Sequence, residues 1–163
     1  MDFTTLGALL RVYEHNMKVL HWGCFGPKFD RAHKLCDEYA EMIHEDVDWA
    51  GETGLRIDQN PPSFDKIIEI LQNADDNYIV CQYKLVDYPE VTKTIEKMLH
   101  DIMNALKSIH ESDLMEDPSN MGIKSTIESI YDKYDFEVRY LNRRRMMPHE
   151  GNHHDDNREH HDD

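Results

Sequence analysis

The fold of this chain is decided by residues 21–33, HWGCFGPKFDRAH. The Gly-Pro pair at 26–27 is a turn signal between two stretches of helical periodicity, so it predicts the bend of a helical hairpin. His21 and His33 lie six residues on either side of the proline, and two antiparallel helices would place their imidazoles level with each other. Asp37 follows one helical turn later on the same face. Imidazoles and carboxylates bind divalent transition metals, so the hairpin predicts a metal site.

A second pair of candidate ligands, Asp48 and Glu52, is spaced by one turn on the same predicted helix. Asp48 lies 11 residues beyond Asp37. At about 1.5 Å per residue this separation is about 16 Å, so the two groups cannot bind one ion within one chain. A two-fold symmetric dimer with antiparallel second helices would unite them. Each of its two sites would take His21, His33 and Asp37 from one subunit and Asp48 and Glu52 from the other.

Four long segments have the periodicity of amphipathic helices. The first covers residues 6–20, and the second continues from the bend to about Ile57, with Asp30 placed to cap its N-terminus. The third begins near Pro89, because proline suits the first turn of a helix. The fourth is expected to run from about 121 to 145.

The chain between the second and third segments is a long crossover. Consecutive prolines at 61–62 end the second helix, and residues 63–86 have room for one or two short helices. Four long helices with one long crossover describe an all-α, ferritin-like four-helix bundle. We expect this bundle to form one domain over residues 1–147.

The composition indicates an acidic protein that does not enter membranes. The chain has 163 residues, 39% of them hydrophobic, and a formal net charge of −15. No apolar stretch approaches the roughly 18 residues of a membrane span, and the N-terminus lacks the regions of a signal peptide, so a cytoplasmic location is expected. The three cysteines lack CxxC spacing, which argues against a disulfide framework or a thiolate zinc site.

Direct DNA binding is disfavoured by this charge, because contacts with phosphates need clustered Lys and Arg. The one basic cluster, Arg139 with residues 143–145, ends the fourth predicted helix. Favourable charge at a helix C-terminus explains this cluster better than a nucleic-acid patch does.

Residues 148–163 contain five His, six acidic residues and one Arg, so a disordered acidic tail is expected. The tail is either a solubilising extension or a weak metal-binding segment.

Residues 6–57 resemble the Dps-type mini-ferritins, the family of DNA-binding proteins from starved cells within the ferritin-like superfamily. The resemblance rests on HWGCFGPKFDRAH, Asp37 and the segment DWAGE at 48–52, which are similar to that family's ferroxidase signature. It implies a homo-oligomer, a hollow dodecamer of two-fold dimers, that oxidises Fe(II) with hydrogen peroxide or dioxygen and stores ferric mineral. One or two irons would bind at each subunit interface. The implied catalytic and iron-binding residues are His21, Trp22, His33, Asp37, Asp48 and Glu52.

The resemblance also implies roles for two groups of acidic residues, although a solvated helix face and a solvated loop are the alternatives. Carboxylates on the second helix would nucleate mineral, and these are Glu38, Glu41 and Glu45. Carboxylates near the last loop would form an acidic pore that attracts Fe(II), and these are Glu111, Asp113, Glu116 and Asp117.

Two classes of function therefore remain. In the first, the chain is a ferroxidase and iron-storage protein that protects against oxidative damage. In the second, it is a structural or packaging bundle whose metal site locks the dimer interface without turnover.

Four other histidines have no comparable surroundings in the sequence and are assigned no role; they are His15, His44, His100 and His110.

Overall fold

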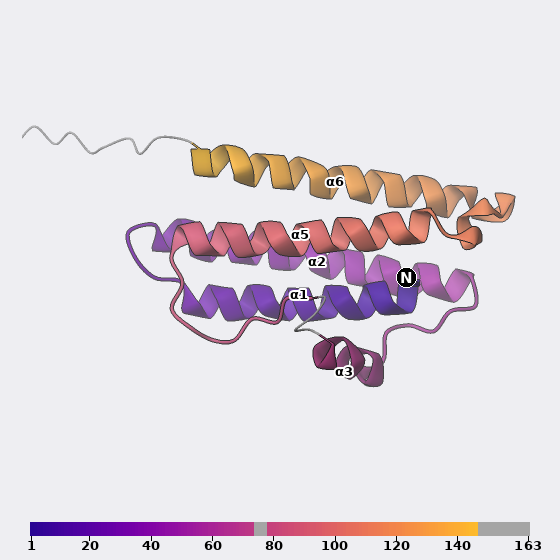
Figure 1. The fold of residues 1–163 in the computed structure, drawn as a ribbon, viewed down its shortest axis with the longest axis horizontal. Coiled ribbons are helices and arrows are strands. Elements are labelled where there is room, and N and C mark those ends of the chain that lie inside the picture. Colours follow the sequence, from indigo (N-terminus) through magenta and orange to yellow (C-terminus); the bar gives the residue numbers. More distant parts are fainter. Residues whose placement is uncertain (74–77, 147–163) are drawn as a thin grey trace, which may run out of the picture.

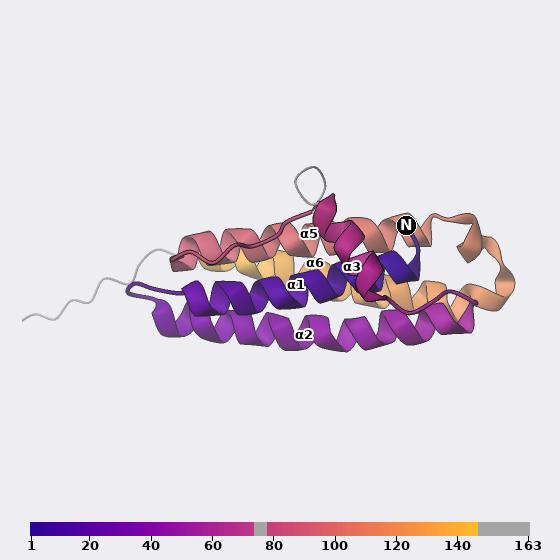
Figure 2. The same cartoon turned by 90° about the horizontal axis from the view of Figure 1, so that it is seen from below.

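Long helices run alongside one another in the computed structural model, which describes residues 1–73 and 78–146 (Figure 1). They are α1 (Phe3–Gly23), α2 (Phe29–Arg56), α5 (Tyr88–His110) and α6 (Met121–Met146). This arrangement confirms the predicted all-α, ferritin-like bundle. The described part of the crossover contains α3 (Phe64–Gln72), which packs against α1 (Figure 2). Two 3₁₀ helices, η1 (Asp113–Glu116) and η2 (Pro118–Asn120), join α5 to α6.

The predicted tail at 148–163 lies outside the described residues, so the domain boundary at 147 stays a prediction. No helix within 1–73 and 78–146 is long and apolar enough to cross a membrane.

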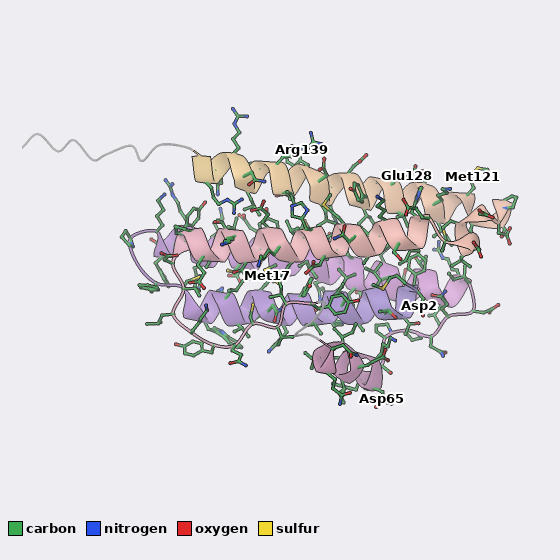
Figure 3. The ribbon with its side chains drawn as sticks, viewed as in Figure 1. Asp2, Met17, Asp65, Met121, Glu128 and Arg139 are labelled. Carbon is green, nitrogen blue, oxygen red and sulfur yellow. The ribbon has the colours of Figure 1, made fainter. Side chains whose placement is uncertain are left out.

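The core is built from the inward faces of the long helices, with Met17 inside the bundle and Asp65 and Met121 at its edges (Figure 3). Burial of these apolar faces is the main force that holds the helices together.

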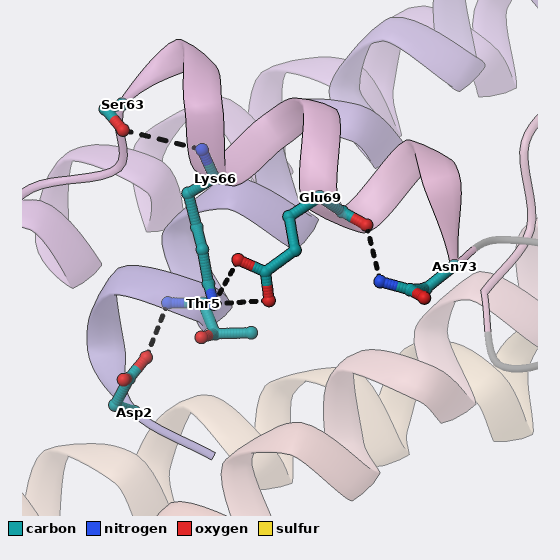
Figure 4. Close-up of polar contacts among 6 residues, drawn as sticks. All are labelled: Asp2, Thr5, Ser63, Lys66, Glu69 and Asn73. Atoms are coloured by element: carbon teal, nitrogen blue, oxygen red, sulfur yellow. Dashed lines mark hydrogen bonds and ion pairs between the residues drawn. The ribbon is translucent and has the colours of Figure 1, made fainter.

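Side-chain caps fix the beginnings of three helices. Asp2 accepts a hydrogen bond from the Thr5 amide at 2.7 Å, and Ser63 accepts one from the Lys66 amide at 3.4 Å (Figure 4). Asp87 caps α5 in the same way, and the predicted proline lies in the first turn of that helix. Each cap satisfies an amide that has no partner within its helix.

The prediction that Asp30 caps α2 is wrong. The cap position is Lys28, which makes no side-chain capping bond, and Asp30 lies inside the first turn. The physical reason is the turn before the helix. Gly26 adopts a φ of +89°, and its carbonyl accepts a hydrogen bond from the Phe29 amide at 3.0 Å, so the helix begins earlier than expected.

The end of the crossover is fixed to the C-terminal end of α1. The Val86 amide donates to the Gly23 carbonyl at 2.8 Å, and the Phe25 amide donates to the Val86 carbonyl at 3.1 Å. A Cβ atom on Gly23 would lie 2.2 Å from the Lys84 carbonyl oxygen, so this close approach requires glycine. The crossover therefore closes the bundle beside the hairpin bend.

A buried amide fixes the same segment further along α1. Asn16 donates to the Ile79 carbonyl at 2.7 Å and accepts from the Cys81 amide at 2.9 Å, so both ends of its side chain are satisfied.

The three cysteines are free thiols, and burial raises the pKa of Cys24, Cys36 and Cys81 above the ordinary value.

Candidate metal centre

Three of the predicted ligands meet at the hairpin bend. His21 lies in the last turn of α1, while His33 and Asp37 lie on one face of α2. One ligand atom from each residue lies within 4.8 Å of the others. Over residues 1–73 and 78–146 this is the only group of three or more His, Cys, Asp or Glu that could hold a metal ion. The two imidazole rings are 3.4 Å apart at their centroids and tilted by 40°.

The donor atoms of this group fit a metal ion. Nδ1 of His21 is buried and has no hydrogen-bond partner in the structure. It lies 3.1 Å from Oδ1 of Asp37, but that contact lacks the geometry of a hydrogen bond. A buried nitrogen without a partner costs free energy, and coordination to a cation would satisfy it. Imidazole nitrogen and carboxylate oxygen together suit Fe(II) and other first-row divalent ions.

Lys18 is part of this site, although it was not predicted from the sequence. Its Nζ lies 2.7 Å from Oδ1 of Asp37. The hydrogen bond from Lys18 and the nearby His21 and His33 hold the pKa of Asp37 below its usual range, so the carboxylate is ionised at neutral pH. Lys18 precedes His21 by three residues and so lies on the same helix face, a spacing from which it could have been found.

Exposed aromatic side chains occur at the hairpin bend beside the group. Trp22, which was predicted to stand beside the site, follows His21 directly and is 61% exposed. Phe25 and Phe29 are also exposed, and the Phe29 ring lies 5.1 Å from that of His33. Several large apolar side chains exposed at one bend are typical of a surface that another molecule covers.

Asp48 and Glu52 are not part of the group within this chain. Both are exposed on α2, on the side of the ligand group that leads to its C-terminal end. Nη2 of Arg11 lies 3.8 Å from Oδ1 of Asp48, and Nη1 of the same arginine lies 3.0 Å from Oε2 of Glu14. The assignment of Asp48 and Glu52 to a site shared between subunits therefore stays a prediction.

The residues predicted for nucleation are all exposed on α2, and they are Glu38, Glu41 and Glu45. Glu38 pairs with Lys34 at 3.5 Å. The residues predicted for a pore are exposed between α5 and α6, and they are Glu111, Asp113, Glu116 and Asp117. Asp117 also has a local role, because its carboxylate accepts the Ser119 amide at 2.8 Å, which lowers its pKa.

No protein-family model matches the sequence, and no curated protein matches it either. Solved structures do share the fold. Antigen TpF1 from Treponema pallidum matches with a TM-score of 0.76 at 16% identity, over 89% of each chain. The DPS protein from Vibrio cholerae O1 matches with a TM-score of 0.72 at 18% identity, over 86% of this chain and 84% of that one. That protein is described as a member of a broad superfamily of ferritin-like diiron-carboxylate proteins.

A truncated Dps from Mycobacterium smegmatis gives a TM-score of 0.71 at 12% identity, over 86% of this chain and 92% of that one. This chain has the fold of the Dps-type mini-ferritins. The resemblance found over residues 6–57 thus extends to the architecture of the whole bundle. In this Dps-like fold the ligand group lies at the bend between α1 and α2.

Proposed function

We propose that this protein binds Fe(II) at His21, His33 and Asp37, oxidises it with hydrogen peroxide or dioxygen, and stores the ferric product inside a hollow homo-oligomer. The observation that carries the proposal is that one donor atom each from His21, His33 and Asp37 lie within 4.8 Å of one another, while Nδ1 of His21 is buried without a hydrogen-bond partner. Carboxylate oxygens stabilise Fe(III) more than Fe(II), so a site with this donor set favours oxidation.

Three protein donors leave coordination positions open for a second chain and for the oxidant. Asp48 and Glu52 of a second copy would occupy some of these coordination positions if the two α2 helices packed antiparallel about a two-fold axis. The distribution of exposed apolar residues supports this dimer. Trp22 and Phe25 lie at the bend, and Leu55, 60% exposed, lies just beyond Glu52 at the other end of α2. An antiparallel pairing brings these two ends together.

A second apolar surface belongs to α3. Phe64, Ile68 and Leu71 follow the spacing of one helix face and are all exposed, Phe64 by 83%. A small helix that presents such a face to water would gain free energy by covering it. We assign this face, like the aromatic residues at the bend, to contacts between copies of the chain in the oligomer.

The test is oxidation of Fe(II) by peroxide under anaerobic conditions, with particle size recorded in the same samples. The variants are His33→Ala, Asp48→Ala and both together, and the matched control is His100→Ala, an exposed histidine of α5 outside the ligand group. We expect the wild type and the control to oxidise many irons per subunit in a large particle, and the double variant to lose turnover.

The single variants separate the possible failures. Full activity of Asp48→Ala would refute the shared site and leave the ligand group of one chain as sufficient. Bound metal without turnover in the wild type would refute the ferroxidase and favour the structural, interface-locking role. A wild-type protein that remains small would refute storage in a hollow oligomer.

A further inference from the structure

Glu41 and His44 lie on the exposed face of α2, midway between the two pairs of predicted metal ligands on that helix. They are three residues apart, so their side chains share one side of the helix. Metal sites in helical bundles use this Glu-x-x-His spacing, because both side chains can then reach one ion. At this position one chain supplies one carboxylate and one imidazole, which is half of a four-ligand site.

The ring of His44 is held in place by α1. Its Nδ1 lies 2.8 Å from Oε1 of Glu14, and Oε2 of the same carboxylate accepts a hydrogen bond from Nη1 of Arg11 at 3.0 Å. In protein metal sites the other ring nitrogen of a ligating histidine is usually hydrogen-bonded to a carboxylate or a carbonyl, which fixes the ring and its tautomer. Glu14 has this position at His44, so Nε2 is the nitrogen available to a metal ion.

A second surface pair of the same kind lacks the spacing. His110 of α5 lies 2.9 Å from Glu128 of α6, but the residue three positions before His110 is Lys107. A lysine on that face repels a cation. The pair of His110 and Glu128 is therefore a matched control for the carboxylate that His44 has beside it.

The shared iron site fixes which residues meet at the two-fold axis, and this inference therefore rests on the proposed function. If Asp48 of a second copy lies level with Asp37, then Glu52 of that copy lies level with His33, because each pair is four residues apart on an antiparallel helix. Both ligand pairs thus agree on one register. The axis then crosses α2 midway between Asp37 and Asp48.

At this axis Glu41 of each copy lies level with His44 of the other. The two levels are three residues apart, which is about 4.5 Å along the helices. Packed helices have axes about 8–10 Å apart, so four side chains of this length can converge on one point. The two Glu41 carboxylates would repel each other there, and a bound cation would offset their charge.

We propose that Glu41 and His44 of two copies bind one divalent transition-metal ion on the two-fold axis, separate from the two shared iron sites. Two imidazole nitrogens and two carboxylate oxygens suit Zn(II) in tetrahedral geometry, and the same donors bind Fe(II) and Co(II). Over residues 1–73 and 78–146 no third ligand joins this pair within one chain. The ion therefore binds the dimer and not the single copy, and it stabilises the dimer directly. The nucleation role predicted for Glu41 requires no histidine, so variants of His44 separate the two roles.

The test is titration of the full chain with Co(II), followed by its visible absorption, in a His33→Ala background that disrupts the ligand group at the bend. The variants are Glu41→Gln and His44→Ala, and the matched controls are Glu128→Gln and His110→Ala. The histidines of residues 148–163 are present in every sample and contribute equally. Thermal melts confirm that each variant is folded.

We expect the spectrum of tetrahedral Co(II) at about one ion per two subunits, as the two-fold symmetry requires. It should be lost in Glu41→Gln and in His44→Ala and kept in both controls. Sedimentation at dilutions where the subunits separate gives a second measurement. Zn(II) at about 100 times its Kd should tighten the dimer about 100-fold in the same background, and the effect should vanish in the two variants.

A spectrum that persists in either variant, falls equally in the controls, or reaches one ion per subunit would overturn the inference and leave the ferroxidase standing. A wild type that binds this ion but oxidises no iron with peroxide would overturn the proposed function and leave the site on the axis. A chain that stays monomeric in saturating metal would overturn the site on the axis together with the shared iron site.

Discussion

Lys18 occupies a place at Asp37 that a metal ion also needs, and its removal should tighten metal binding. The ammonium lies 2.7 Å from Oδ1 of Asp37, and each side chain is 46% exposed. An exposed ion pair of this kind contributes about 0.2–1 kcal/mol. Because about 1.4 kcal/mol corresponds to a tenfold change in affinity, Lys18→Met should bind a divalent ion about 1.4- to 5-fold more tightly. Methionine keeps most of the aliphatic stem, so the packing of α1 changes little.

The assay is titration with Co(II), followed by its visible absorption, at low and at high ionic strength. Protein with His33→Ala gives the background from other groups, including the histidines of residues 148–163. The matched control is Lys34→Met, which removes a lysine paired with Glu38 outside the ligand group. The gain in Lys18→Met should shrink at high salt, because screening weakens the pair it removes. Weaker binding in Lys18→Met would show that the lysine supports the site and would refute the competition argued from its position.

Three further outcomes are expected. The first concerns three acidic residues exposed on α2, Glu38, Glu41 and Glu45. Replacing all three by alanine should slow mineral growth in absorbance traces but leave the initial oxidation unchanged. An unchanged growth rate would contradict their role in nucleation. Gly23→Ala should cost about 1–3 kcal/mol in urea unfolding, because its Cβ would clash with the Lys84 carbonyl, and a smaller loss would mean that the crossover yields easily. Asp2→Ala should cost about 1 kcal/mol at pH 7. Burial acts to raise the pKa of Asp2, but the hydrogen bonds with Thr5 outweigh it and lower the pKa below 3.8. The stability from the cap is therefore present above pH 3.8 and is lost as the pH falls through the lowered pKa. A destabilisation by Asp2→Ala that persists in acid would refute this assignment.

The part of the site that lies within one hairpin could be predicted from spacing. His21, His33 and Asp37 are joined by a short bend, and helical geometry alone places them on facing sides of α1 and α2. Lys18 follows from the same geometry but carries no ligand chemistry that would single it out. The cap of α2 was misplaced because a positive φ at Gly26 sets where the helix begins, and the periodicity of side chains does not contain that angle.

Contacts between helices far apart in the chain could not be predicted. Glu137 lies 98 residues after Tyr39, and nothing in the spacing of either residue says that α2 and α6 are neighbours at that level. The same holds for Lys133 and Asp46, which pair across 87 residues. Periodicity identifies which face of a helix is buried, but the partner of each buried polar group depends on how the faces are matched in the bundle.

The separation of the metal ligands along the chain has a consequence for how the protein is made. His21 and His33 are only 12 residues apart, whereas α5 and α6 complete the bundle much later in the sequence. Contacts between near neighbours form faster than distant ones, so the hairpin of α1 and α2 should take shape first during folding. Pulse-labelled hydrogen exchange during refolding should protect its amides before those of α6, and simultaneous protection would contradict this order. A nascent chain would then present three metal donors at the ribosome while the helices that later enclose the core are still being synthesised.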